Sequence, residues 1–274
     1  MRSLREILLA SDFSSRSDRP LARATQLAAE SGATLVIAYM LESRRTRSWS
    51  ETEARERLIV DLPPELRETP LVIEHGSPDA RIAAIADERG SDLIVLGVAR
   101  QNSIGDYLTG STVDHIIRHA GAPVLVVRRR CFGPYAALIA ATDFSRGSRQ
   151  AVLKAAELFP GTPIHLVHSF LPPYSAWLKS ADVQAEVALK AKEEMDAFIA
   201  DVRAAAGSDP VLSGEVVEGE AGTVIPDIAF ARGADLLILG THGQGGLSHA
   251  TIGSTAEVLL TLVGCDALVV RASG

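Results

Sequence analysis

The strongest chemical signal in the chain is a glycine-rich stretch at residues 240–255, GTHGQGGLSHATIGST. Glycine lets the backbone adopt unusual φ values and approach a ligand closely. Gly253, Ser254 and Thr255 then open an apolar helical pattern, and the free N–H groups and positive dipole end of a helix N-terminus suit an anion. A strand end, a glycine loop and a helix start together predict a phosphate-binding site. The hydroxyls of Ser254 and Thr255 could bind phosphate, or Ser254 could simply cap the helix.

Other nucleotide-binding motifs are missing from the sequence. There is no G-x-x-x-x-G-K-[ST] P-loop, and no G-x-G-x-x-G fingerprint follows the first apolar run. His242 lies inside the glycine-rich stretch, but neither a nucleophile nor an orienting carboxylate stands beside it, which favours a solvated loop histidine. A flexible connection without a ligand is the alternative interpretation of an isolated glycine loop.

The chain is an internal duplication. Four segments of the first half recur in the second: ILLASDFS at 7–14 as LIAATDFS at 138–145, SDLIVLG at 91–97 as ADLLILG at 234–240, GST at 110–112 as GST at 253–255, and VLVVR at 124–128 as ALVVR at 267–271. The numbering offset is 131 for the first pair and 143 for the others, so the second half carries a longer insertion between them. Two homologous domains are predicted, residues 1–131 and 132–274.

Each half shows alternating strand and helix patterns. In the second half, short apolar runs predict strands at 137–141, 164–168, 214–218, 235–240 and 267–271. Nearly continuous hydrophobicity is typical of a sheet covered on both faces. Apolar residues at three- and four-residue steps predict a helix over 182–206. We therefore expect an α/β fold in which each domain is an open sheet of five parallel strands with helices on both faces, and ligands of such sheets bind at the carboxyl ends of the strands.

Composition and charge exclude several classes of protein. The net charge of −7 argues against a non-specific nucleic-acid binder, because neutralising phosphates needs an excess of Lys and Arg. The first apolar run stops at Asp12, short of the roughly 7–15 residues that the apolar region of a signal peptide needs, and no run approaches a membrane span. Two cysteines, Cys131 and Cys265, cannot form a disulfide scaffold and fit a reducing cytoplasm.

These residues resemble a known family. The spacing Gly240, two residues, Gly243, nine residues, Gly253-Ser254 is similar to the ATP-binding signature of the universal stress protein family. ATDFS at 141–145 is similar to the end of that family's first strand, and the resemblance covers essentially the whole chain as a tandem pair. It implies two Rossmann-like domains arranged as a pseudo-two-fold pair, an adenine nucleotide held by the loops after the first and fourth strands, and a role in stress survival.

The resemblance also implies a role for individual residues in the second half. Thr142 and Asp143 would lie against adenine and ribose, and the backbone near Ser169 would meet the base. Gly240 would approach the ribose. The triphosphate, with Mg²⁺ neutralising part of its charge, would be held by Gly243, Gly253, Ser254 and Thr255.

The first half departs from the signature at its second glycine. Residues 97–111 keep the spacing, but Arg100 replaces that glycine. Its long side chain could block the approach of phosphate, or its guanidinium could pair with phosphate. Asp106 adds a carboxylate to the same loop, and a carboxylate repels phosphate. We therefore expect the first domain to bind ATP weakly or not at all.

The remaining histidines and cysteines point to structural roles. His115 and His119 have the spacing of two helix-borne zinc ligands, but no third ligand is nearby in sequence, so a metal site is not expected. His165 and His168 lie three apart on a strand and should point to opposite faces. If the fifth strands of the two domains pair as the resemblance implies, the two cysteines would be neighbours across that seam, and unlinked thiols are favoured there.

The sequence favours a cytoplasmic ATP-binding protein over an enzyme, since it shows phosphate-binding backbone without an identifiable base, nucleophile or arginine finger. One alternative is a slow ATP hydrolase or nucleotidyl transferase, to which Asp143 or His242 would contribute. Another is a nucleotide-free module whose loop binds a protein. The expected partners are an adenine nucleotide and a protein of unknown identity, with no nucleic acid and no membrane. The two domains are expected to form an internal pseudo-dimer, and a homodimer of whole chains is a further option.

Overall fold

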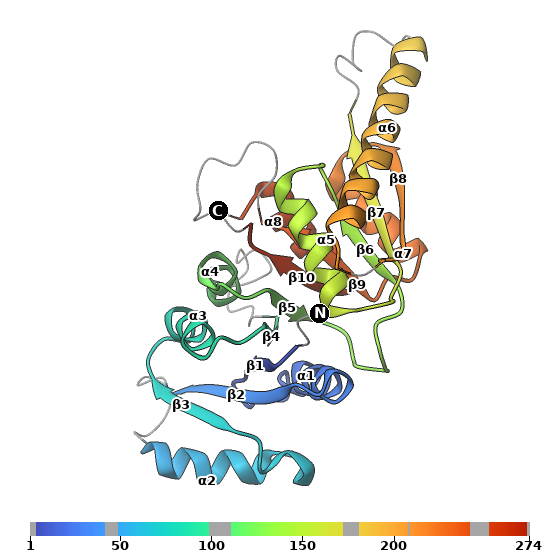
Figure 1. The fold of residues 1–274 in the computed structure, drawn as a ribbon. Coiled ribbons are helices and arrows are strands. Elements are labelled where there is room, and N and C mark those ends of the chain that lie inside the picture. The colour runs from blue at the N-terminus through green and yellow to red at the C-terminus, as the bar shows by residue number, and fades with distance from the viewer. Residues whose placement is uncertain are drawn as a thin grey trace. The chain divides into compact units, whose positions relative to one another are not determined.

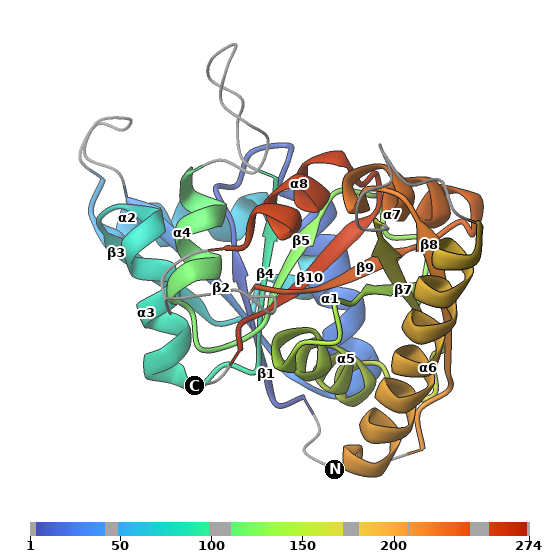
Figure 2. The ribbon, with the colours of Figure 1, turned by 90° about the horizontal axis from the view of Figure 1, so that it is seen from above.

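The computed structural model describes residues 4–41, 49–98, 111–171, 181–207, 209–241 and 252–272. Contacts within the chain divide it into two compact units, Ser3–Pro134 and Tyr135–Gly274, called here the N-terminal and C-terminal units. Colour follows the residue number from blue to red in both views of the ribbon (Figures 1 and 2). None of the helices within the described ranges is long and apolar enough to cross a membrane.

The N-terminal unit alternates strands with helices. Its elements are β1 (Glu6–Ala10), α1 (Asp18–Ser31), β2 (Thr34–Leu41), α2 (Glu51–Asp61), a 3-10 turn (Pro64–Leu66), β3 (Leu71–His75), α3 (Pro78–Arg89), β4 (Leu93–Gly97), α4 (Ser111–His119) and β5 (Val124–Val127). The strands lie in the order β3-β2-β1-β4-β5, and all neighbours run parallel.

The C-terminal unit repeats this arrangement. Its elements are β6 (Leu138–Ala141), α5 (Arg146–Leu158), β7 (Ile164–Phe170), α6 (Ala181–Ala205), β8 (Leu212–Glu218), α7 (Ala221–Ala231), β9 (Leu236–Gly240), α8 (Ser254–Leu262) and β10 (Asp266–Val270). The strand order β8-β7-β6-β9-β10 is again parallel throughout. The expected α/β fold with five parallel strands in each domain is confirmed, and the predicted long helix is α6.

Burial explains why the strands are almost continuously apolar. Ile7, Leu8 and Leu9 of β1 are completely buried, although successive side chains of a strand point to opposite faces. Both faces must therefore be covered. In the C-terminal unit, α5 packs against α6 and α7 packs against α8, and these pairs cover the two faces of the sheet (Figure 2).

The strand order reverses direction at the same position in each unit. In the C-terminal unit the chain runs from the central strand β6 outward through β7 to β8, and then returns to β9 on the other side of β6. The connections after β6 and β9 therefore leave in opposite directions. Open parallel sheets bind ligands at the carboxyl ends of the strands where the order reverses in this way.

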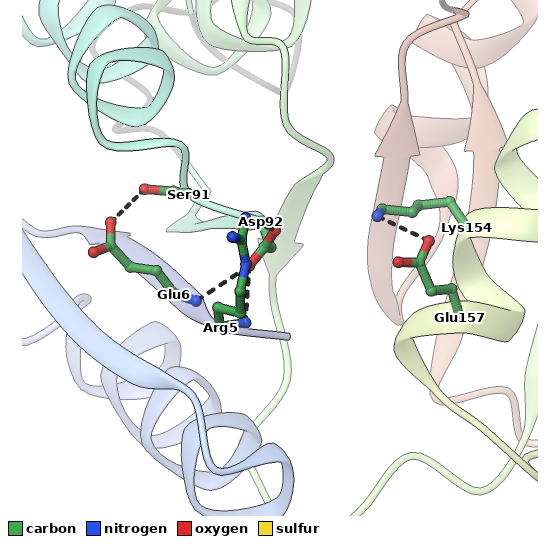
Figure 3. A network of polar contacts seen from close by, with 6 residues as sticks. All are labelled: Arg5, Glu6, Ser91, Asp92, Lys154 and Glu157. Atoms are coloured by element: carbon green, nitrogen blue, oxygen red, sulfur yellow. Dashed lines mark hydrogen bonds and ion pairs between the residues drawn. The ribbon is translucent and has the colours of Figure 1, made fainter. Parts of the chain in front are cut away.

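A repeated aspartate joins the strands at the opposite edge of each sheet. Oδ2 of Asp92 accepts hydrogen bonds from the amides of Arg5, at 2.8 Å, and Glu6, at 3.3 Å (Figure 3). Oδ2 of Asp235 accepts the equivalent bonds from the amides of residues 136 and 137, at 3.0 and 3.1 Å. The aspartate therefore recurs in both halves for a structural reason, which is to fix the start of the central strand.

Candidate functional site

The candidate site lies at the carboxyl edge of the C-terminal sheet. The register pairs Ala140 of β6 with Ile238 of β9, and Ala141 of β6 with Val167 of β7. The residues that the sequence predicts to bind a nucleotide lie just beyond these paired positions. Thr142 and Asp143 follow β6, Ser169 lies near the end of β7, and Gly240 is the last residue of β9. The fold thus brings these four residues to one edge.

The N-terminus of α8 lies at the same edge. The amide of Gly253 donates to the carbonyl oxygen of Thr241, the residue after β9, at 2.7 Å. Gly253 is the N-cap residue, and Ser254 and Thr255 are exposed residues of the first turn. The capping interpretation of Ser254 is therefore wrong, because Ser254 lies inside the helix and Gly253 is the N-cap. Glycine has no side chain that could occupy the end of the helix.

Gly240 has a packing reason to be glycine. A Cβ atom at this position would lie 2.7 Å from the carbonyl carbon of Gly147 and 2.8 Å from its oxygen, in the first turn of α5. Contacts this short between a side chain and backbone do not occur without movement of one of them. At Gly97, the equivalent residue of the N-terminal unit, the nearest atom would be Cγ of Pro20 at 3.4 Å. The close approach of α5 to the strand end is therefore a property of the C-terminal unit.

Several predicted residues lie outside the described ranges. Gly243 and His242 belong to 242–251, and Arg100 and Asp106 belong to 99–110. Their expected roles stay predictions.

The turn after β6 has an uncommon backbone. Phe144 has a φ of 61°, in the left-handed region that bulky side chains avoid. Two side chains hold the turn, since Oγ1 of Thr142 accepts from the amide of Phe144 at 3.0 Å and Oδ1 of Asp143 accepts from the amide of Ser145 at 3.1 Å. Thr142 is buried, and its hydroxyl also contacts that of Ser148 at 3.0 Å. Side chains of the turn itself therefore stabilise its backbone, and Asp143 lies at the centre of the turn.

The equivalent turn of the N-terminal unit is held differently. Phe13 has the same left-handed conformation, with a φ of 51°. Oδ1 of Asp12, however, accepts from the amide and hydroxyl of Ser14 and from the hydroxyl of Ser17, at 3.0, 2.6 and 2.8 Å. Ser17 can reach Asp12 because α1 begins only at Asp18. Both aspartates thus hold their own turns, and in the N-terminal unit the hydroxyl of Ser17, one residue before α1, takes part as well.

The corresponding helix of the C-terminal unit starts earlier. α5 begins at Arg146, and its N-cap Ser145 accepts from the amide of Ser148 through its hydroxyl at 3.2 Å. Ser148, which corresponds to Ser17, is consequently inside the helix. The two turns have similar sequences, yet the helices that follow them begin at different positions.

The two histidines of β7 lie on opposite faces of the sheet, as predicted. Nδ1 of His165 is 2.8 Å from Oγ of Ser213, and its Nε2 is 2.8 Å from Oε1 of Glu215 on β8. Nδ1 of His168 instead lies 2.8 Å from the carbonyl oxygen of Thr142, and its ring packs on Phe144 with 4.3 Å between centroids. The contact of His168 with the site turn was missed from the sequence. The register between β6 and β7, which would reveal it, becomes available only with the sheet.

Charge interactions around Glu215 lie on the α7 side of β7. Partial burial opposes ionisation of this carboxyl, but hydrogen bonds from His165 and Arg232 outweigh it, so the pKa of Glu215 lies below its usual value.

Among the residues that the structure describes, no group of three or more His, Cys, Asp and Glu side chains is placed to hold a metal ion. His115 and His119 stack on each other, with 3.9 Å between ring centroids. Neither Cys131 nor the buried Cys265 forms a disulfide bond.

Comparisons with known proteins agree with the duplication. The model of the universal stress protein family matches residues 3–128 and again 134–271. The chain is 25% identical over 252 residues to universal stress protein E of Salmonella typhi, covering 84% of this chain and 75% of that protein. It is 30% identical over 143 residues to a putative universal stress protein of Staphylococcus haemolyticus, covering 47% and 87%. A crystal structure of a Pseudomonas aeruginosa protein of unknown function shares the fold, with a TM-score of 0.70, 21% identity, and coverage of 98% and 93%.

Proposed function

The chain belongs to the universal stress protein family, whose domain it carries twice, and on this premise we propose that its C-terminal unit binds ATP and that the protein acts as a nucleotide-dependent regulator of a stress response. The observation that carries the proposal is the position of the α8 N-terminus. Its exposed first turn lies beside the ends of β6 and β9, at the point where the strand order reverses. This is the place where open parallel sheets bind their ligands.

The start of α8 suits the phosphates. The first N–H groups of a helix have no partner within it, and the helix dipole adds partial positive charge. Since the chain carries a net charge of −7, local backbone dipoles rather than a basic surface would have to attract the anion, helped by Mg²⁺ bound to the phosphates. The Ser254 and Thr255 hydroxyls are exposed beside these amides and would add hydrogen bonds. In the proposed site Gly243 and Gly253 let the phosphates approach the backbone.

The ends of β6 and β7 suit the nucleoside. A carboxylate accepts several hydrogen bonds at once, so Asp143 can hold its own turn and a ribose hydroxyl together. Thr142 lies next to it against the base, and the backbone at Ser169 would recognise the edge of the adenine. Gly240 lies between the nucleoside and phosphate ends of the proposed site. The family resemblance supplies these roles, and the shared sheet edge brings the residues together.

We propose binding, rather than turnover, as the role of this site. The residues gathered at the edge offer hydrogen bonds and a helix dipole, which stabilise a bound nucleotide without attacking it. The release of a partner protein or its capture would then follow the occupancy of the site.

Mass spectrometry of the purified chain under native conditions tests the proposal. We expect a population carrying one adenine nucleotide through purification, or taking up one when ATP and Mg²⁺ are added. Prolonged incubation should leave the ATP intact. A chain that takes up no nucleotide would refute the proposal, and sustained ADP or AMP release that stops in Asp143→Ala would assign the site to an enzyme instead.

A further inference from the structure

We infer that His168 is a positioning residue for Asp143, a role that rests on the proposed ATP site. His168 lies on β7, the strand next to the turn, and contacts the residues on both sides of the aspartate. It reaches the carbonyl of Thr142 before Asp143 and the ring of Phe144 after it. A side chain held at two points around a carboxylate can set the direction in which that carboxylate points.

The first contact is a hydrogen bond from the imidazole. Nδ1 of His168 lies 2.8 Å from the carbonyl oxygen of Thr142. Because a carbonyl oxygen can only accept, Nδ1 must carry the proton and donate. The bond joins the end of β7 to the first residue after β6, one residue beyond the last paired residues of these strands, Ala141 and Val167. It therefore extends the attachment of the turn to the sheet.

The second contact supports an unfavourable backbone. A non-glycine residue in the left-handed region is strained and persists only where its surroundings impose that conformation. The ring of Phe144 packs between His168, at 4.3 Å, and Phe198 of α6, at 5.7 Å between centroids. These aromatic contacts keep Phe144 in its conformation. That conformation in turn presents the amide of Ser145 to Asp143.

The N-terminal unit provides an internal comparison. Ala10 of β1 pairs with Ala38, as Ala141 of β6 pairs with Val167, so Tyr39 is the counterpart of His168. The ring of Tyr39 meets Phe13 edge to face, with 5.7 Å between centroids. A phenol ring supports the left-handed phenylalanine, but it has no ring N–H with which to bind the preceding carbonyl. The histidine is therefore found in the unit whose sequence has the intact glycine signature, and the tyrosine is found in the other unit.

The position of His168 predicts which part of a nucleotide it affects. It lies at the end of the proposed site where the nucleoside binds. The phosphate end is anchored separately, through the hydrogen bond from Gly253 to Thr241. Loss of the imidazole N–H should weaken recognition of adenosine and leave the attraction of phosphate by α8 unchanged. General damage to the domain would weaken both.

Two substitutions separate the contacts. His168→Phe keeps a ring beside Phe144 and removes the donor, whereas His168→Asn places an amide N–H where Nδ1 stood and removes most of the ring. His165→Phe is the matched control, since it changes the other histidine of the same strand on the opposite face. We expect His168→Phe to weaken ATP and adenosine by about threefold to tenfold, the effect of one lost hydrogen bond. His168→Asn keeps a donor but loses packing on Phe144, so its loss should be smaller than that of His168→Phe, and His165→Phe should stay within about twofold of the wild type.

Two measurements test the inference. Titration calorimetry gives the affinities for ATP, adenosine and tripolyphosphate, and amide hydrogen exchange is measured on the ligand-free proteins. In His168→Phe we expect unchanged tripolyphosphate binding and faster exchange of the Phe144 and Ser145 amides. Unchanged exchange at these amides, or an equal loss for tripolyphosphate, would overturn the positioning role. A wild-type chain that binds no ATP would refute the proposed function, while the exchange rates would still decide whether His168 holds the turn.

Discussion

The amide N–H of Gly253 donates to the carbonyl oxygen of Thr241 across 2.7 Å, which ties the N-terminus of α8 to the end of β9. The glycine loop between these residues therefore leaves and rejoins the sheet at one place. This attachment, rather than the loop alone, sets the direction of the helix dipole. In the proposed site, the backbone N–H of Ser254 would then contact a phosphate.

Ser254→Pro removes that N–H with little change to the fold. Proline is well tolerated at the first position of a helix, and Gly253, with φ −62° and ψ 144°, already has the extended backbone that a residue before proline prefers. We expect ATP affinity to fall about tenfold or more, since hydrogen bonds to charged groups contribute about 1.5–3 kcal/mol. Calorimetric titration measures the affinity, and the unfolding temperature should change little.

Ser254→Ala is the control for the hydroxyl. It keeps the N–H and removes only the side-chain oxygen, so a smaller loss of affinity is expected. Because Ser254→Pro removes the hydroxyl as well, an equal loss in the two variants would show that the side chain, and not the backbone N–H, holds the phosphate.

Gly240→Ala should destabilise the C-terminal unit. The added methyl group would meet the backbone of Gly147 at 2.7 Å, and relieving such overpacking costs about 1–3 kcal/mol. Gly97→Ala is the matched control in the N-terminal unit, because its methyl group finds ordinary contact distances. Denaturant unfolding should show the loss in Gly240→Ala and a change of about 0.5 kcal/mol or less in Gly97→Ala. Equal losses in the two variants would contradict this account of Gly240.

Acid should weaken the network around Glu6 at the amino edge of the N-terminal sheet (Figure 3). Partial burial opposes ionisation of Glu6, but its hydrogen bonds with Arg89 and Ser91 prevail and lower its pKa. A carboxyl whose pKa is lower in the folded state stabilises that state above its unfolded pKa, and the contribution is lost as the pH falls through the folded pKa. Glu6→Gln should therefore be less stable than the wild type at pH 7, and the difference should close as the pH falls below about 4.3.

Glu157→Gln provides the comparison for this pH dependence. Its partner Lys154 lies three residues away on the surface of α5, also drawn in Figure 3, and surface ion pairs of this kind contribute little. Urea unfolding at several pH values should show a small effect at every pH. A difference for Glu6→Gln that stays constant down to pH 3 would contradict the assignment.

Much of the architecture could be predicted because it depends on local patterns. Repeated apolar runs of strand length, with helical periodicity between them, specify parallel sheets covered on both faces. Once that topology is known, Thr142 and Gly240 must meet at one edge, since each ends a central parallel strand. The predicted gathering of these residues follows from strand order and needs no side-chain detail.

The remaining features depend on contacts between distant residues. The packing of Gly240 on Gly147 and the bond from His168 to Thr142 both depend on how helices and strands meet. Likewise, ASDFS and ATDFS predict the same turn, yet α1 starts later than α5, which leaves Ser17 outside the helix to bind Asp12. The sequence also does not fix the N-cap of α8: serine is the stronger capping residue, but Gly253 holds that position and Ser254 lies inside the helix.

The number of ATP molecules bound per chain tests the central claim most directly. Titration calorimetry with ATP and Mg²⁺ should give one site per chain. Gly243→Arg, which copies Arg100 of the N-terminal unit, should abolish it, whereas Gly264→Arg, an exposed glycine at the amino end of β10, should leave it intact. Two equivalent sites per chain, or a site that survives Gly243→Arg, would contradict the assignment of ATP to the C-terminal unit.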